Sequence, residues 1–432
     1  MRSVFELLRH ERRARVFFAA LAQSALGTGA AYVALLLVAL DRFNSPWAIG
    51  LVLLADVVPA MLLGPLFGTF ADRWSRRGCA IFADVLRALA FLGLVLVDGF
   101  VPTFLLALLA GVGTGLFTPA ALAALPSLVE ERRLPAATSL FGAIADFGFI
   151  AGPAAAAAVL LVGSPETILA ANAITFGLSA LALGALSFGE APVGGELEGP
   201  RPSLLRETRQ GLIATAGMAG LRVILAASGA ALLFGAIFNV GQPLLAQEEL
   251  GSSDAGFGVL VTAYGLGFIT GTLSGSRGGE LSLLRRRYLS GAFLMALGFA
   301  ASGLAPSVAA AVVTFLAAGY GNGMLLVYER LLIQALVPDA LSGRVFGIRD
   351  AITAWAFAVG FLAAPLLLDV VGIRAMITAA GVFGLIVWLA TTIALRRSGL
   401  SAHPSLPLTG GAGADLAWQR RPGEHGADAL GG

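Results

Sequence analysis

Twelve apolar runs, each close to the length that a helix needs to cross a lipid bilayer, fill most of this 432-residue sequence. A membrane-spanning helix requires about 20 mainly apolar residues. Hydrophobic residues make up 57% of the chain and charged residues only 12%, which is far from the usage of a soluble domain. The runs cover residues 16–40, 46–70, 79–98, 101–127, 139–163, 165–188, 220–246, 255–275, 288–304, 307–335, 345–369 and 372–395. We therefore expect an all-α membrane protein with twelve transmembrane helices.

The arginines between these runs alternate between the two sides of the membrane. Arginines precede the first run and follow the second, fourth, sixth, eighth, tenth and twelfth, whereas the opposite loops hold only Arg42 and Arg374. Because positively charged loops stay in the cytoplasm, this alternation predicts an even number of spans and two cytoplasmic termini. We expect a multi-pass protein of the plasma (inner) membrane.

A polar interval divides the runs into two sets of six. The predicted parts are a cytoplasmic segment 1–15, a six-helix bundle 16–188, a cytoplasmic linker 189–219, a second six-helix bundle 220–396 and a disordered cytoplasmic tail 397–432. The two sets repeat weakly, since "FGFIAGP" in the first corresponds to "VGFLAAP" in the second. Parallel repeats of this kind occur in secondary transporters, with the substrate site between the halves near the midplane.

The loop after the second run resembles the major facilitator superfamily. The signature of that superfamily, G-x-[apolar]-A-D-R-x-G-R-[RK], is met by Gly68, Phe70, Ala71, Asp72, Arg73, Arg76 and Arg77, with Ser75 in place of a glycine. In the fifth run, Gly148, Gly152 and Pro153 match most of the antiporter signature G-x-x-x-G-P-x-x-G, and Ala156 replaces its last glycine.

The segment "LFTPAALAALPSLVEERRLPAATSL" is similar to the bacterial siderophore and macrolide exporter branch of that superfamily. Ala121 stands where that branch has an arginine, so a role for that arginine is not carried over. The resemblance covers all twelve runs. It implies a major facilitator fold of two pseudo-symmetric bundles, a bacterial origin and the efflux of small molecules.

The glycines of the loop signature have a physical reading of their own. Gly64 and Gly68 lie on one helix face, where the lack of side chains lets a neighbouring helix approach closely. In the second half, Gly267 and Gly271 have the same spacing. Asp72 follows at the cytoplasmic boundary, where its carboxylate can meet the positive N-terminus of another helix. The resemblance implies that this partner is the start of the eleventh run, residues 342–345, and that the contact latches the halves.

The arginines of this motif are Arg73, Arg76 and Arg77. They can pair with carboxylates of the next cytoplasmic loop, such as Glu130 and Glu131. The alternative to a gate is a positively charged loop that only fixes the topology.

Two carboxylates inside apolar runs are candidates for carrying a proton. Asp56 is near the middle of the second run, with no arginine within a helical turn, and Asp146 lies in the fifth. Because an ionisable side chain at the bilayer centre costs at least ~2.5 kcal/mol, each needs a partner, water or a function. Asp56 can instead be a buried acid that stays protonated or is hydrogen-bonded to another helix. Asp146 can instead be a structural partner of Arg349.

Other charges within the runs predict conformational charge pairs. The candidates are Asp84, Arg87, Glu329, Arg330, Arg349 and Asp350. Asp84 and Arg87 are three residues apart, a spacing that brings two helical side chains together. Glu329 and Arg330 are adjacent and point to different faces, so each needs a partner on another helix.

Polar and aromatic side chains mark a possible substrate pathway. The candidates are Gln23, Thr28, Asn172, Asn239, Gln242, Tyr320, Asn322 and Trp355. The first and seventh runs are equivalent under the repeat, and polar groups on both suit a central pathway. The alternatives are that the polar groups join helices and that Trp355 faces lipid.

The composition predicts no catalytic chemistry, cofactor or metal. One cysteine, Cys79, and three histidines cannot form a metal cluster. Without any lysine there is no G-x-x-x-x-G-K-[ST] loop for ATP. The arginines are spread between apolar runs, which excludes a nucleic-acid surface. No set of His, Asp, Ser or Cys converges at one depth, so we expect a protein that is not an enzyme.

These observations together predict a secondary active transporter. We expect proton-coupled efflux of small apolar or amphipathic molecules, such as a drug, a siderophore or a secondary metabolite, by alternating access. The expected partners are the substrate, the proton and the bilayer, with the protein acting as a monomer. The alternatives are a proton-coupled importer of a small nutrient and a sensor built on a transporter fold.

Overall fold

The computed structural model describes residues 2–73, 75–186, 217–276 and 280–398, and this part of the chain is helical without a β-strand. Twelve of its helices have 20 to 33 residues. They are α2 (Arg12–Phe43), α3 (Pro46–Arg73), α4 (Arg76–Leu96), α5 (Phe100–Ala124), α6 (Leu134–Val159), α7 (Pro165–Ala185), α9 (Ala219–Leu244), α10 (Asp254–Leu273), α11 (Leu281–Gly303), α12 (Val308–Leu336), α13 (Asp339–Val371) and α14 (Ile373–Arg397). Each matches one predicted apolar run. The chain is an all-α membrane protein.

Nine segments of the described chain are long and apolar enough to cross a membrane, and α3 contributes a shorter apolar stretch, Pro46–Leu62. Of the twelve long helices, α3, α6 and α11 are outside those nine. In α11 the apolar part is short because Arg285, Arg286 and Arg287 occupy its second turn. The count of twelve spans therefore stays a prediction for these three helices.

Residues that favour turns separate neighbouring helices at two of the breaks between the apolar runs. Asn44 takes the left-handed conformation (φ 43°) after α2, and Pro46 begins α3. Gly372 (φ 79°) separates α13 from α14, a backbone angle that favours glycine.

The short helix α1 (Arg2–His10) is not predicted by the sequence analysis, which treats residues 1–15 as a segment outside the membrane. Its apolar face packs against α2 and α6, and Leu7 is fully buried. The segment is thus attached to the first group of helices.

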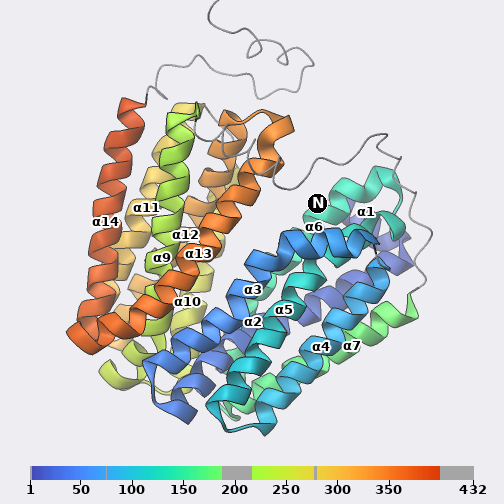
Figure 1. Ribbon diagram of the computed structural model, residues 1–432, viewed down its shortest axis with the longest axis horizontal. Coiled ribbons are helices and arrows are strands. Elements are labelled where there is room, and N and C mark those ends of the chain that lie inside the picture. The colour runs from blue at the N-terminus through green and yellow to red at the C-terminus, as the bar shows by residue number, and fades with distance from the viewer. Residues whose placement is uncertain (1, 74, 187–216, 277–279, 399–432) are drawn as a thin grey trace, which may run out of the picture.

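The long helices form two groups with the same packing pattern (Figure 1). In the first group α2 packs on α6 and α7, α3 on α5, and α4 on α5 and α7. In the second group α9 packs on α13 and α14, α10 on α12, and α11 on α12 and α14. Most of the predicted tail and most of the predicted linker lie outside the described residues, so the domain boundaries stay a prediction.

Within each group, a glycine lets two neighbouring helices touch through their backbones, and the two contacts are equivalent under the repeat. A Cβ atom on Gly111 of α5 would lie 2.3 Å from the carbonyl oxygen of Asp56 in α3. A Cβ atom on Gly319 of α12 would lie 1.9 Å from the carbonyl oxygen of Tyr264 in α10. Both members of the pair shift by the same 208 residues, from 111 to 319 and from 56 to 264. The shared shift gives the register of the internal repeat.

The two groups meet through α3 with α13 and through α6 with α10. A Cβ atom on Gly50 would lie 2.4 Å from the Phe361 carbonyl oxygen, and one on Gly258 would lie 2.8 Å from the Ala157 Cα. Both contacts lie near the first turns of α3 and α10, at the end of the molecule opposite the chain termini. Figure 1 shows the groups tilted apart from this lower end toward the end where α1 and the last turn of α14 lie.

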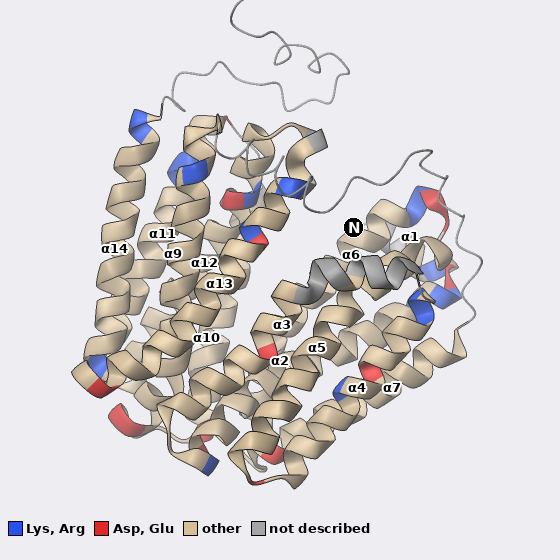
Figure 2. Ribbon diagram, viewed as in Figure 1, with Lys and Arg blue, Asp and Glu red and all other residues tan. Residues whose placement is uncertain are grey.

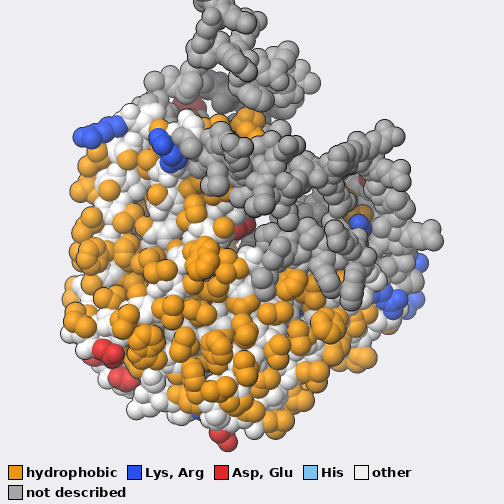
Figure 3. Space-filling model, in the orientation of Figure 1, with side chains coloured by type: hydrophobic (Ala, Val, Ile, Leu, Met, Phe, Trp, Pro, Cys, Tyr) orange, Lys and Arg blue, Asp and Glu red, His pale blue; other side chains and the backbone are white. Residues whose placement is uncertain are grey.

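The outer surface is suited to lipid. Large apolar side chains such as Leu89 (61% exposed), Leu96 (73%) and Ile174 (63%) are exposed. On the face shown in Figure 3 apolar side chains cover the middle of both groups. Figure 2 shows the charged residues concentrated toward the helix ends.

Candidate transport site

A cavity of about 220 Å³ lies between the two groups of helices. Helices α2, α3 and α6 line it from one side and α9 to α13 from the other. Its polar lining consists of Tyr32, Asn239, Gln242, Tyr264 and Asn322. The rest is mostly apolar, with Val57, Pro153, Phe299, Phe357 and Phe361 among the lining residues. A mainly apolar wall with a few hydrogen-bonding groups is typical of a small-molecule site.

Four of the five polar residues of the cavity form two hydrogen-bonded pairs. Gln242 Nε2 donates to Asn239 Oδ1 at 2.8 Å, within α9. Asn322 Nδ2 of α12 donates to Tyr264 Oη of α10 at 2.8 Å. These bonds fix the orientation of the amides while leaving further donors and acceptors for a bound molecule.

Three of the eight predicted pathway residues line this cavity: Asn239, Gln242 and Asn322. Tyr320 packs half-buried against the core instead. Trp355 on α13 is 62% exposed and is not part of the cavity wall, in keeping with its alternative as a lipid-facing side chain. The sequence analysis missed Tyr32 and Tyr264, which also line the cavity. Tyr264 is the repeat-related equivalent of Asp56, but that register becomes visible only in the structure.

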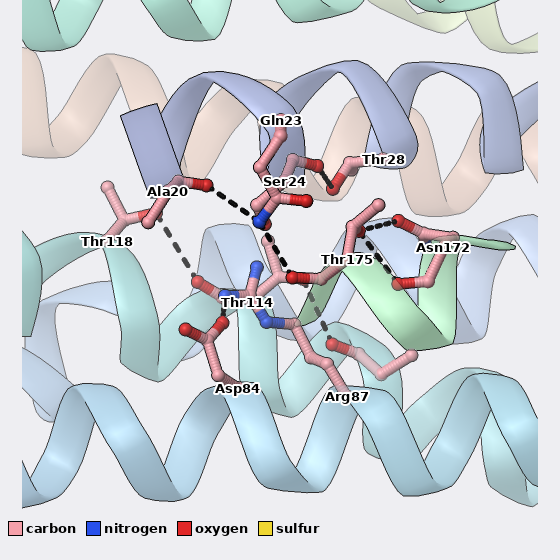
Figure 4. A network of polar contacts seen from close by, with 11 residues as sticks. Ala20, Gln23, Ser24, Thr28, Asp84, Arg87, Thr114, Thr118, Asn172 and Thr175 are labelled. Carbon is pink, nitrogen blue, oxygen red and sulfur yellow. Dashed lines mark hydrogen bonds and ion pairs between the residues drawn. The ribbon is translucent and has the colours of Figure 1, made fainter. Parts of the chain in front are cut away.

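The remaining pathway candidates lie inside the first group of helices (Figure 4). Gln23 Nε2 of α2 donates to the Thr175 carbonyl oxygen of α7 at 2.8 Å and to the Ala20 carbonyl oxygen at 3.0 Å. Thr28 donates to the Ser24 carbonyl oxygen at 2.9 Å. Asn172 accepts from the Thr175 hydroxyl at 3.1 Å. Gln23 thus joins α2 to α7, the alternative given for such groups.

Asp84 and Arg87 of α4 form an ion pair in this interior (Figure 4). Asp84 is fully buried and Arg87 is 4% exposed. The guanidinium carbon lies 4.2 Å from the ring centre of Phe117 and 4.1 Å from that of Phe176. Two aromatic faces and one carboxylate therefore stabilise the buried cation.

The second group of helices lacks this charge pair. Gly113 faces the Arg87 side chain, and a Cβ there would lie 2.7 Å from Arg87 Cγ. At the equivalent position Gly321 faces the backbone nitrogen of Met295, again with the shift of 208 residues. The repeat is therefore symmetric in its backbone packing and asymmetric in its charge.

Asp56 lies half-buried on α3, next to the cavity residue Val57. Within the described chain it has neither a hydrogen bond nor an ion pair. Its electrostatic neighbours are Arg87 of α4 and Tyr32 of α2. No arginine lies within one turn of Asp56 on α3, but the fold places Arg87 of α4 where it interacts electrostatically with Asp56.

Glu329 and Arg349 connect α12 to α13. Arg349 Nε lies 2.9 Å from Glu329 Oε1, and its second nitrogen lies 3.3 Å from Oε2. Arg349 also pairs with Asp350 at 3.0 Å. Arg330, the other member of the adjacent pair, is exposed. The side chain of Asp146, the other partner considered for Arg349, lies outside the description.

The loop motif is described only in part. Gly64, Gly68, Asp72 and Arg73 belong to α3, but their side-chain surroundings lie outside the description, so the latch stays a prediction. Arg76 donates to the Ala123 carbonyl oxygen at 3.0 Å, and Arg77 donates to the Leu183 carbonyl oxygen at 3.1 Å. These bonds satisfy carbonyls near the ends of α5 and α7.

Of the two loop carboxylates considered for these arginines, Glu130 pairs with Arg132 at 2.6 Å. The hydrogen bond from the Arg132 guanidinium lowers the pKa of Glu130 below its usual value. This pair is exposed, so it contributes little to stability.

The glycine and proline motif of α6 lies beside the cavity. A Cβ atom on Gly148 would lie 2.5 Å from the Ala25 carbonyl oxygen, and one on Gly152 would lie 2.4 Å from the Gly29 Cα. Pro153 and Gly29 both line the cavity. The motif thus lets α6 and α2 touch through their backbones at the cavity wall.

Two matched groups of membrane helices around a central cavity define a carrier of the major facilitator type. A family model described as "Transmembrane secretion effector" matches residues 3–409, and the chain belongs to this family. The predicted membership of the major facilitator superfamily, near its exporter branch, is confirmed.

Relatives and solved structures agree with this membership. The putative bacilysin exporter BacE of Bacillus subtilis is 28% identical over 332 residues, covering 75% of this chain and 81% of that protein. Macrolide efflux protein A of Streptococcus pyogenes is 21% identical over 345 residues, covering 77% and 84%. A crystal structure of a POT family transporter in complex with 5-aminolevulinic acid is similar in fold, with a TM-score of 0.70, 13% identity and coverage of 90% and 97%.

Proposed function

We propose that this protein exports small apolar or amphipathic molecules from the cytoplasm by alternating access, in exchange for protons. The observation that carries the proposal is the cavity shared by both groups of helices, with Gln242 and Asn322 on one side and Tyr32 on the other. A site at the seam between two repeats can open to either side when the repeats rock. The relatives named as exporters support the outward direction of transport.

The arginine pattern supports an orientation with both termini in the cytoplasm of a bacterium. In that orientation the end at which the groups meet is the outer one. The conformation described here then has its outer side closed, and export requires the contacts of Gly50 and Gly258 to separate. We propose a single chain as the working unit, since both halves of the cavity come from one chain.

Asp56 is our proposed proton carrier. It is half-buried in α3 beside the cavity residue Val57, and Arg87 from α4 is its charged neighbour. A carboxylate at this depth is costly unless it is neutralised, so its proton occupancy can differ between the two conformations. Asp146 is the second candidate, on the α6 segment that leads to Gly148 and Gly152.

Transport by cells that make the protein tests this function. Cells with and without the protein are loaded with a macrolide, bacilysin or a cationic dye, and the retained amount is measured with the membrane energised and after a protonophore. We expect lower retention in cells with the protein, and we expect the protonophore to remove the difference.

A pair of glutamine variants links the flux to the cavity. Gln242→Ala removes a cavity amide, whereas Gln23→Ala removes an amide that joins α2 to α7 outside it. At equal amounts in the membrane, only Gln242→Ala is expected to change the order of preference among the compounds. Higher retention in cells with the protein would instead indicate an importer, and no flux for a broad panel would indicate a sensor.

A further inference from the structure

A second hollow lies away from the central cavity, on the side of the second group formed by α11 and α14. It has a volume of about 820 Å³ and lies at the end of the molecule that carries the chain termini. On each helix, lining residues recur at every fourth position. They are Arg285, Leu289 and Phe293 on α11, and Trp388, Thr392 and Arg396 on α14. At 1.5 Å per residue, each series extends about 12 Å along its helix.

The mouth of this groove is positively charged. Arg285, Arg286 and Arg396 line it, and no carboxylate is among its lining residues. Arg285 Nη1 is buried without a hydrogen-bond partner in the described structure. By contrast, the neighbouring Arg287 turns inward and donates to Tyr328 Oη at 2.5 Å. A buried guanidinium nitrogen that lacks an acceptor favours the binding of an anion.

The deeper part of the groove is apolar and aromatic. The rings of Phe293 and Trp388 lie 4.9 Å apart, and the Trp388 indole nitrogen is another buried donor without a partner. On the outer face of α14 the exposed side chains Ile386 (55%), Leu389 (52%) and Ile393 (43%) lead toward Arg396. A ligand that fits has an anionic head and long apolar chains.

We propose that this groove binds an anionic phospholipid, with the lipid phosphate between the three arginines and an acyl chain along Phe293 and Trp388. Basic pockets between helices at the cytoplasmic surface are suited to such headgroups. A soluble phosphate could bind to the arginines but would make no contact with the apolar wall. The site shares no lining residue with the central cavity.

Native mass spectrometry of the purified full-length protein tests the proposal. The protein is taken from nanodiscs of phosphatidylcholine and phosphatidylglycerol, and the lipid retained per chain is counted as the phosphatidylglycerol fraction increases. Each arginine is expected to contribute about fivefold to the affinity, so Arg285→Gln with Arg396→Gln should weaken phosphatidylglycerol retention on the order of 25-fold. A Phe293→Ser variant should weaken the retention of the lipid without changing the charge.

A matched control removes the same charge elsewhere at the same end of the molecule. Arg222 on α9 and Arg397 on α14 are exposed and do not line the groove. Arg222→Gln with Arg397→Gln should retain phosphatidylglycerol like the original chain. Equal losses in the two double variants, equal retention of phosphatidylcholine, or equal competition by inorganic phosphate and by phosphatidylglycerol would each overturn the proposal.

Discussion

Arg349 Nε of α13 lies 2.9 Å from Glu329 Oε1 of α12, and this bond ties together two helices of the second group. The Glu329 side chain is 3% exposed and that of Arg349 is 12% exposed, so removal of either partner leaves a buried charge. We predict that Glu329→Leu destabilises the purified protein by about 3 kcal/mol, measured as a lower thermal midpoint in detergent.

The double variant Glu329→Leu with Arg349→Met should recover most of that loss, since no buried charge is then left unpaired; Asp350, the other partner of Arg349, is 55% exposed. Arg330→Met, at an exposed neighbouring position, should have little effect. If the double variant is as unstable as the single one, the ion pair is not the cause.

The backbone contact at Gly111 predicts a sharp steric effect. Gly111→Ala places a methyl group 2.3 Å from the Asp56 carbonyl oxygen, and the helices must shift. We expect a loss of at least about 2 kcal/mol in stability. Gly319→Ala, at the repeat-related contact, should have the same effect. Gly177→Ala is the control because nothing lies within 4 Å of its Cβ position, and equal stability of all three variants would contradict the packing.

The position of Asp56 predicts that its substitution abolishes proton coupling without affecting folding. In proton-loaded vesicles Asp56→Asn should remove transport driven by a pH gradient while leaving the amount of inserted protein unchanged. Asp98→Asn, in the loop between α4 and α5, is the matched control. Normal pH-driven transport by Asp56→Asn would exclude this residue as the proton carrier.

The Asn322 to Tyr264 hydrogen bond predicts an effect on substrate recognition. Tyr264→Phe removes the oxygen that accepts from Asn322 and should change the apparent KM by roughly three- to tenfold, the equivalent of one hydrogen bond. Tyr320→Phe serves as the control, since Tyr320 is not part of the cavity wall. Kinetics in vesicles measure both, and a similar change in the two variants would place recognition elsewhere.

The apolar runs predict the long helices well because membrane helices must bury a continuous apolar length. Register within the repeat is harder to read. The glycine spacing pairs Gly64 with Gly267, whereas the shift of 208 residues pairs Gly267 with Pro59. The amino-acid sequence of one helix does not reveal which other helix packs against it.

The same reason limits what the sequence predicts about the site. Asn239 and Gln242 share a face of one helix, and both line the cavity. Tyr32 and Tyr264 become neighbours only when the two groups meet. Arg87 approaches Asp56 from another helix, which no spacing along the chain reveals.

The seam between the halves has a mechanical consequence. At Gly50 and Gly258 the halves touch backbone to backbone, and the ion pairs of that end, Arg42 with Glu166 and Arg374 with Glu249, each stay within one half. Separation of the halves at this end leaves both of these ion pairs intact. Opening at this end, which the proposed transport requires, therefore breaks backbone packing without separating either of these ion pairs.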